Sequence, residues 1–231
     1  MRKLLIACVV VAVALTAFFL PFVPLLVLDV NKVGGWVFVE NGVSEDRARL
    51  LVYGGEAASK RKWGWVPPVI YLFCNSNTCL SIYGIEQAKA NSIQSGLFSL
   101  IVISGRGMSA EIVAHELSHA VIYRKSGFMR RIMLPVWLEE GVATYLSEDK
   151  RFLGYSLIVG RDEAKRSAVE LSSIPEREWD HISSVDPFYT YGRASGVAAY
   201  CTRRDQGFIA KLIDVVNDRE KIFLLLDQCL E

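Results

Sequence analysis

The chain has 231 residues, 52% of them hydrophobic, with 26 basic and 25 acidic residues and a formal net charge of +1. This nearly balanced charge gives no electrostatic reason to expect nucleic acid as a partner, and we predict none. About two hundred residues follow the apolar N-terminus, enough for one domain with a substantial core. We therefore expect a membrane anchor over residues 1–30 and one folded domain over residues 31–231.

The chain begins with an apolar run. Arg2 and Lys3 precede the uncharged segment Leu4–Leu28. At 1.5 Å per residue a helix of this length crosses a hydrocarbon core of about 30 Å, which predicts an uncleaved transmembrane helix. The two positive charges favour a cytoplasmic amino terminus, with the folded domain on the periplasmic or extracellular side. A cleavable signal peptide, with its shorter apolar region, is the alternative.

The pattern beyond the anchor predicts an α+β fold, with strands before helices. Three β-rich segments are expected to be strands: Gly35–Glu40, Pro68–Phe73 and Leu97–Ile103. Ser44–Ser59 is expected to be a helix that Ser44 caps. Further helices are expected at Ser109–Lys125, at Pro135–Ser147, and as two or three more from Pro187 to the end.

Four cysteines lie beyond the anchor. Cys74 and Cys79 flank a short turn-like spacer, which suits a local disulfide. Cys201 and Cys229 would then form a second one between C-terminal helices. Four cysteines permit three pairings, and the sequence alone leaves the other two open. Disulfides fit a domain outside the cytoplasm.

The segment His115-Glu116-Leu117-Ser118-His119 carries the strongest chemical signal. Residues i and i+4 share a helix face, so both histidines can offer ring nitrogens to a single metal ion. Glu116 would lie beside that ion and could accept a proton from a water molecule that the metal activates. The alternative is two ordinary histidines of a buried helix. We favour a zinc site with Glu116 as catalytic base.

A candidate third ligand comes from the segment Pro135–Tyr145, which has helical spacing and contains Glu139 and Glu140. A catalytic zinc ion typically takes three protein ligands and keeps one position open. The alternative interpretation of the two glutamates is a solvated acidic pair near a helix N-terminus, where the helix dipole favours negative charge.

Together, these two segments resemble the motifs of the gluzincin metallopeptidases, His-Glu-x-x-His and Trp-Leu-x-Glu-Gly-x-Ala. Five residues match the second motif and Glu139 fills its variable place: Trp137, Leu138, Glu140, Gly141 and Ala143. The resemblance covers roughly residues 97–215. It implies a zincin-like fold, in which a twisted sheet packs on the zinc helix, and one zinc ion per chain on His115, His119 and Glu140.

A weaker likeness involves Tyr191. In gluzincin aminopeptidases a Tyr-x-Lys-Gly segment supplies a tyrosine that stabilises the oxyanion, and Tyr191-Gly192-Arg193-Ala194 is a looser version of it. Tyr189 is the reserve candidate, and an ordinary surface tyrosine is the alternative. His181 is expected in a loop or on the surface, with a second oxyanion donor as the minor alternative.

The chain also departs from the family pattern. The Gly-Ala-Met-Glu-Asn segment, which binds the substrate amino terminus in aminopeptidases of the family, is absent. Thr144 stands where thermolysin-like enzymes carry an aspartate that orients a histidine. The residues around the metal ligands must therefore differ.

The sequence thus predicts a membrane-anchored zinc peptidase that hydrolyses peptide or protein substrates. In the family plan an edge strand beside the zinc helix binds extended peptide, and Leu100–Ile103 is our candidate for it, although its continuous apolar character equally suits an internal strand. A zinc hydrolase of another bond type and a non-catalytic zinc-binding domain are the alternatives.

Overall fold

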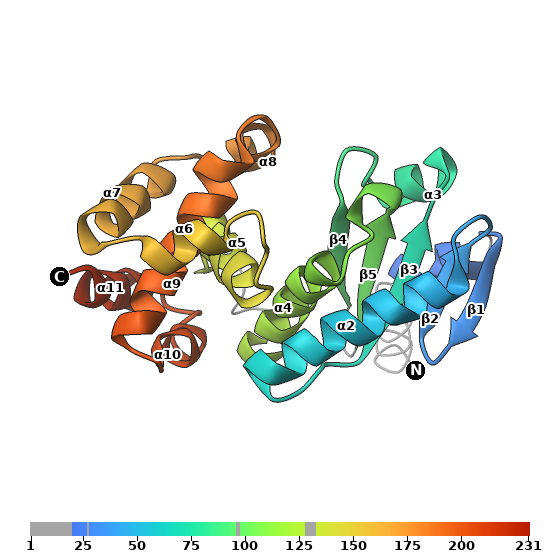
Figure 1. Cartoon of the computed structure of the whole chain (residues 1–231), viewed down its shortest axis with the longest axis horizontal. Helices are drawn as coiled ribbons and strands as arrows, with labels where there is room; N and C mark the ends of the chain where they lie inside the picture. Colours follow the sequence, from blue (N-terminus) through green and yellow to red (C-terminus); the bar gives the residue numbers. More distant parts are fainter. Residues whose placement is uncertain (1–19, 27, 96–97, 128–132) are drawn as a thin grey trace, which may run out of the picture.

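The computed structural model describes residues 20–26, 28–95, 98–127 and 133–231. In this part of the chain a five-stranded sheet in the order β1-β2-β3-β5-β4 is surrounded by helices, so the fold is α+β as expected (Figure 1). β2, β3 and β5 are parallel, and both edge strands are antiparallel to their neighbours. The strands are β1 (Val30–Gly34), β2 (Val37–Glu40), β3 (Val69–Cys74), β4 (Ala90–Ser95) and β5 (Phe98–Ser104).

Helices precede, separate and follow the strands, and those from residue 136 onward form a helical C-terminal part at one side of the sheet (Figure 1). Not all of the described helical segments are α-helical: η1 (Leu20–Leu26) and η2 (Gly105–Gly107) are 3-10 helices, and η4 (Phe188–Gly192) is a π-helix. The α-helices are α2 (Glu45–Trp63), α3 (Asn77–Ile82), α4 (Ala110–Ser126), α5 (Val136–Leu146), α6 (Leu153–Ile158), α7 (Arg161–Ser172), α8 (Glu176–Val185), α9 (Arg193–Arg204), α10 (Phe208–Asp214) and α11 (Arg219–Leu230).

The expected strands and the first helices are confirmed to within a few residues. The Ser44 side chain accepts a hydrogen bond from the Arg47 amide and so caps α2 as expected. β1, α3 and β4 were not expected, and neither were α6, α7 and α8, which occupy residues 153–185. These segments are short or largely polar, so their hydrophobic periodicity is weak.

The expectation that Leu100–Ile103 forms the edge strand is wrong. These residues lie in β5, between β3 and β4, and all four are buried. A strand covered on both faces needs apolar side chains on both, which explains the continuous apolar run. The edge strand on this side is β4, whose sequence Ala90-Asn91-Ser92-Ile93-Gln94-Ser95 is too polar to have indicated a strand.

α2 and α4 cover one face of the sheet (Figure 1). Val113, Leu117 and Ala120 of α4 pack there against side chains of β3 and β5. Gly55 lets the two helices approach closely, because a Cβ atom at this position would lie 2.4 Å from Cγ1 of Val113. α4 thus packs against both α2 and the sheet.

The opposite face of the sheet is covered by α3 and by the end of the N-terminal apolar run. Cys79 of α3 forms a disulfide with Cys74 at the end of β3. Phe22 and Leu25 of η1 pack on the same face. No helix in the described part is both long and apolar enough to cross a membrane, and residues 1–19 of the expected anchor lie outside that part.

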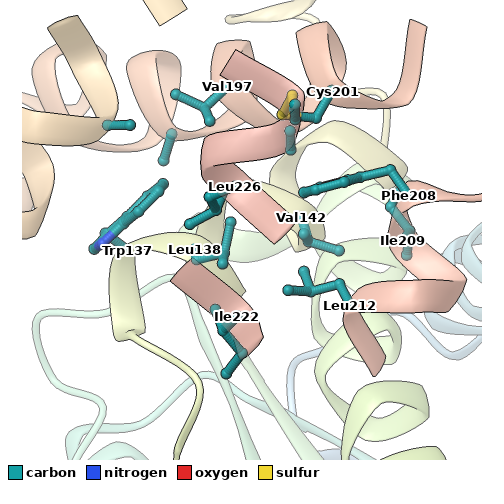
Figure 2. Close-up of a cluster of buried hydrophobic side chains, with 14 of the residues drawn as sticks. Trp137, Leu138, Val142, Val197, Cys201, Phe208, Ile209, Leu212, Ile222 and Leu226 are labelled. Atoms are coloured by element: carbon teal, nitrogen blue, oxygen red, sulfur yellow. A yellow bond between two sulfur atoms is a disulfide. The ribbon is translucent and has the colours of Figure 1, made fainter. Parts of the chain in front are cut away.

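The helical part has its own apolar core (Figure 2). α5 contributes Trp137, Leu138, Val142 and Leu146, while α9, α10 and α11 supply most of the remainder. The disulfide Cys201–Cys229 joins α9 to α11, so both expected pairings are confirmed. Ile122 of α4 belongs to this core, so α4 is buried on two sides.

Candidate metal centre

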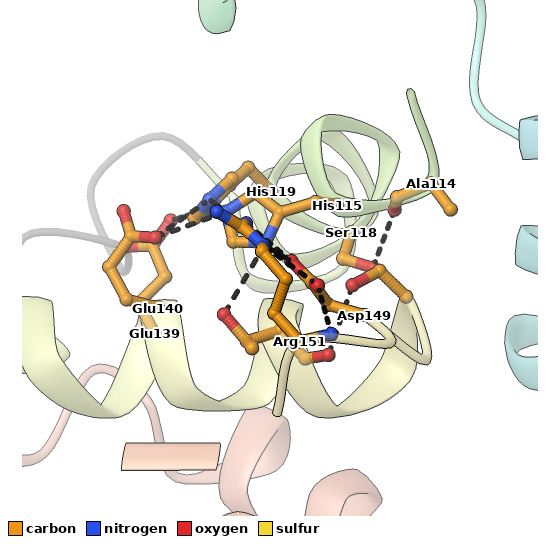
Figure 3. Close-up of polar contacts among 10 residues, drawn as sticks. Ala114, His115, Ser118, His119, Glu139, Glu140, Asp149 and Arg151 are labelled. Carbon is orange, nitrogen blue, oxygen red and sulfur yellow. Dashed lines mark hydrogen bonds and ion pairs between the residues drawn. The ribbon is translucent and has the colours of Figure 1, made fainter. Parts of the chain in front are cut away.

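α4 begins and ends at recognisable signals and presents both histidines on one side. The Ser109 hydroxyl accepts a hydrogen bond from the Ile112 amide at the N-terminus, and Gly127 follows the last turn with a positive φ. His115 and His119 lie away from the residues of α4 that face the sheet. They therefore point toward α5 (Figure 3).

α5 brings two glutamates to the same place. Pro135 precedes its first turn, and Trp137, Leu138 and Val142 anchor it in the helical core. The side chains of Glu139 and Glu140 then project toward the histidines of α4 (Figure 3).

Three ligand atoms converge between these helices. Nε2 of His115 lies 3.1 Å from Oε2 of Glu140 and 3.2 Å from Nε2 of His119. Nε2 of His119 lies 3.5 Å from the same glutamate oxygen. This group of one carboxylate and two imidazoles could hold a metal ion. The three residues predicted as ligands are thus brought together by two helices separated by a long connection.

Glu140 is suited to be an anionic ligand. Burial by itself would raise the pKa of this carboxyl, but the adjacent His119 and His115 lower it well below its usual range. The side chain therefore stays ionised at neutral pH. The solvated-pair interpretation of the two glutamates does not describe it, because its side chain is only 20% exposed and that of Glu139 only 9%.

Glu139, which the family motif leaves variable, contacts the other side of one histidine. Its Oε1 lies 2.8 Å from Nδ1 of His119. Since a carboxylate only accepts hydrogen bonds, Nδ1 carries a proton, so a neutral His119 imidazole has its lone pair on Nε2, the atom that faces the cluster. Sequence reasoning missed this role, and the only available signal was that two adjacent carboxylates follow the histidine motif.

The surroundings of His115 differ from those of His119. Oγ1 of Thr144 lies 3.5 Å from Nδ1 of His115, so a weak hydroxyl contact occupies the place of the family aspartate. Burial would raise the pKa of Asp149, but Arg151, whose Nη2 lies 2.5 Å from Oδ2 of Asp149, lowers it, and His115 adds a smaller lowering. The buried carboxylate near His115 is thus that of Asp149, which follows the end of α5.

The cluster opens into a cavity of about 280 Å³. Glu116 lines it and is only 8% exposed, beside the predicted ligands rather than among them. β4 forms one wall through Ala90, Asn91 and Ser92, and α8 contributes Asp180. A larger cavity of about 560 Å³ lies at the carboxyl ends of α2 and α4, and none of the predicted site residues lines it.

Tyr191 also lines the cavity and is not an ordinary surface residue. Its ring packs edge-on against His115, with ring centroids 6.2 Å apart, and against Trp179 at 5.8 Å. Burial, followed by the negative charge of Glu140, raises the pKa of its phenol, which therefore stays protonated and able to donate a hydrogen bond. It lies in the π-helix η4, a type of segment often found at functional sites.

The two reserve residues lie elsewhere. The Tyr189 ring is covered by the guanidinium of Arg193, whose Cζ lies 5.1 Å from the ring centroid, and this tyrosine does not line the cavity. His181 is exposed on α8 and does not line the cavity either. The expectation of a surface position for His181 is confirmed.

Comparison of the chain with protein families, with curated proteins and with solved structures gave no match. The gluzincin resemblance therefore stays a prediction that depends on the residues and geometry described above.

Proposed function

We propose that this chain is a zinc-dependent peptidase of the gluzincin type, with a zincin-like domain that an N-terminal helix holds at the outer side of a membrane. The proposal depends chiefly on the spacing of the three ligand atoms. At zinc–ligand distances of about 2.0–2.1 Å, tetrahedral geometry separates two ligand atoms by about 3.4 Å. The separations between His115, His119 and Glu140 are 3.1, 3.2 and 3.5 Å.

The residues present also suit zinc chemically. Two imidazoles and one carboxylate form a ligand set that is known in catalytic zinc sites. A zinc ion bound there would supply Lewis-acid chemistry, polarising a substrate carbonyl and lowering the pKa of a water molecule. Glu139 keeps His119 in the tautomer that such binding requires.

The remaining roles belong to side chains that line the cavity. Glu116 accepts the proton of the attacking water and delivers it to the leaving amine, an assistance typically worth about 10²–10⁴-fold in rate. Tyr191 donates a hydrogen bond from its phenol to the oxyanion that develops on the substrate carbonyl. Its raised pKa keeps this donor protonated throughout the neutral range.

β4 provides a place for the substrate backbone. It is the edge strand on this side of the sheet, and Ala90, Asn91 and Ser92 line the cavity beside the cluster. An extended peptide can add to such an edge through main-chain hydrogen bonds. This geometry favours a polypeptide over a compact small molecule as the substrate.

The first test is the zinc content of the purified full-length chain beside its Glu140→Ala variant. We expect about one zinc ion per chain in the wild type and a large loss in the variant, because a carboxylate ligand has been removed. A folded wild-type protein that takes up no zinc under metal-replete conditions would refute the proposal.

The second test separates the enzyme from its alternatives. We expect the wild type to cleave a peptide library and Glu116→Gln to lose about 10²–10⁴-fold in rate with its zinc retained. Tyr191→Phe should lower kcat by about 10²–10³-fold, also with zinc retained, whereas Tyr189→Phe should change little. Zinc binding without cleavage of any peptide would favour a non-catalytic domain or a hydrolase of another bond.

A further inference from the structure

We propose that Asp180 selects substrates that carry a cationic group next to the bond to be cleaved, either a lysine or arginine side chain or a free amino terminus. This inference rests on the proposed peptidase function and names the substrate class of the same site.

Asp180 is held at the cavity by its neighbour. Trp179 is 2% exposed and packs edge-on against Tyr191, which fixes α8 against the wall of the site. Asp180, the next residue of α8, lines the cavity together with Glu116, Glu140 and Tyr191. Its charge acts on the phenol, since Asp180 is one of the groups that raise the pKa of Tyr191.

Asp180 differs from the other carboxylates of the cavity. Glu140 contacts both histidines, and Glu116 is buried. The Asp180 side chain is exposed, and within the described part of the chain it forms no hydrogen bond or ion pair. It is thus the lining carboxylate whose charge is available to a substrate.

The described residues that line the cavity include no lysine or arginine, and the two histidines among them face Glu140. Arg151, which does not line the cavity, already forms an ion pair with Asp149. A substrate that reaches this wall therefore meets a negative charge, which favours an ammonium or guanidinium group and disfavours a carboxylate.

The experiment compares kcat/KM for matched peptides. One set is blocked at both ends and carries lysine, norleucine or glutamate at each position around the cleaved bond. A second set lacks basic residues and has either a free or an acetylated amino terminus. The enzymes are the zinc-loaded full-length wild type, Asp180→Asn, Asp180→Lys and the control Glu178→Lys. Glu178 is also an exposed acidic residue of α8 but does not line the cavity, so this control makes a comparable charge change.

In one of the two sets, we expect the wild-type kcat/KM to be about fivefold or more higher for the cationic peptide than for its neutral counterpart. Asp180→Asn should abolish this preference, Asp180→Lys should invert it toward glutamate, and Glu178→Lys should keep it. Glu116→Gln slows cleavage, so peptide affinities can be measured in this background, and they should show the same charge preferences. A preference for lysine in blocked peptides indicates an endopeptidase, and a preference for free amino termini indicates an aminopeptidase.

Two other outcomes would overturn the inference, and they differ in what else they overturn. If the wild type cleaves peptides without regard to charge, or if Asp180→Asn keeps the preference, the role of Asp180 is refuted and the peptidase function stands. If the zinc-loaded protein cleaves none of the peptides, the proposed function fails together with this inference.

Discussion

At the scale of single residues, the adjacent glutamates Glu139 and Glu140 make different contacts with the two histidines. Glu140 faces the Nε2 atoms of both histidines, while Glu139 contacts Nδ1 of His119 from the other side of the ring. The same pair of carboxylates thus supplies one candidate ligand and one group that orients a ligand. This arrangement predicts different consequences for their removal.

Replacing Glu139 by alanine should weaken zinc binding without destroying the site. The His119 ring would lose the acceptor that fixes its tautomer and orientation, and such losses typically cost about 10–100-fold in metal affinity. Competition with a zinc chelator measures this directly. Glu139→Gln is the matched control, because its amide oxygen can still accept from Nδ1 and should retain most of the affinity. Equal losses in both variants would contradict an orienting role.

Glu40 stabilises the fold in a pH-dependent way. Partial burial would raise the pKa of its carboxyl, but hydrogen bonds from the Ser76 hydroxyl and from the amides of Ser76 and Asn75 lower it below the usual value of 4.5. A depressed carboxyl pKa contributes stability that is fully present above the unfolded-state pKa and is lost as the pH falls from there through the lower folded-state pKa. The loop that enters α3 therefore loosens in acid.

We expect Glu40→Gln to lower the free energy of unfolding by about 1 kcal/mol at pH 7, a value that allows for partial solvent exposure. The difference from the wild type should shrink as the pH falls below 4.5 and through the lowered pKa of the native carboxyl, where that group also becomes neutral. Denaturant unfolding at several pH values tests this. Glu86→Gln, at an exposed position, is the control and should change little. A difference that persists unchanged at pH 3 would contradict the linkage.

At the scale of the elements, close helix contacts explain a glycine of the second motif. A Cβ atom on Gly141 would lie 2.5 Å from the carbonyl oxygen of Ala194, so α5 meets the backbone of α9 at this point. The glycine therefore sets the distance between two helices, next in sequence to the candidate ligand Glu140. Packing against α9 therefore explains why a glycine occupies this position of the motif.

Gly141→Ala should destabilise the protein by about 1–3 kcal/mol, since one of the two backbones has to move. It should also lower the zinc affinity, because Glu140 moves with α5. Gly154→Ala is the control: it makes the same change in helix α6, and its new Cβ would meet no atom within 4 Å. That variant should be neutral or slightly more stable, by up to about 1 kcal/mol. Thermal unfolding of both variants tests this. Equal midpoints for Gly141→Ala and Gly154→Ala would contradict a tight contact between α5 and α9.

At the scale of the whole molecule, α4 joins two cores. One side of this helix packs on the sheet and another packs in the helical part, so the histidines lie where the two parts meet. The disulfides reinforce the two parts separately, one at the end of β3 and the other between α9 and α11.

The two disulfides should contribute unequally to stability. Cys201 and Cys229 are 28 residues apart, and Cys74 and Cys79 are 5 apart. Loop-closure entropy then gives about 3–4 kcal/mol for the long loop and about 2 kcal/mol for the short one. Unfolding of the two paired alanine variants in denaturant measures both values. A larger loss from the short loop would show that local packing, rather than chain entropy, dominates.

Local sequence determined the elements that carry the chemistry. The histidine motif lies on a helix that its own Ser109 caps, and the apolar runs of β3 and β5 are long enough to indicate buried strands. These signals depend on neighbours along the chain, which is why they can be read without the fold. The resemblance then selected Glu140 from two adjacent carboxylates.

Only the tertiary structure decided how distant segments meet. Nothing local shows that Glu139 reaches Nδ1 of His119 or that Asp180 lines the cavity. Each of these relations joins residues far apart in the chain, and each depends on the packing of α4 between two cores. Hydrophobic periodicity reports which face of an element is buried, but not which partner buries it.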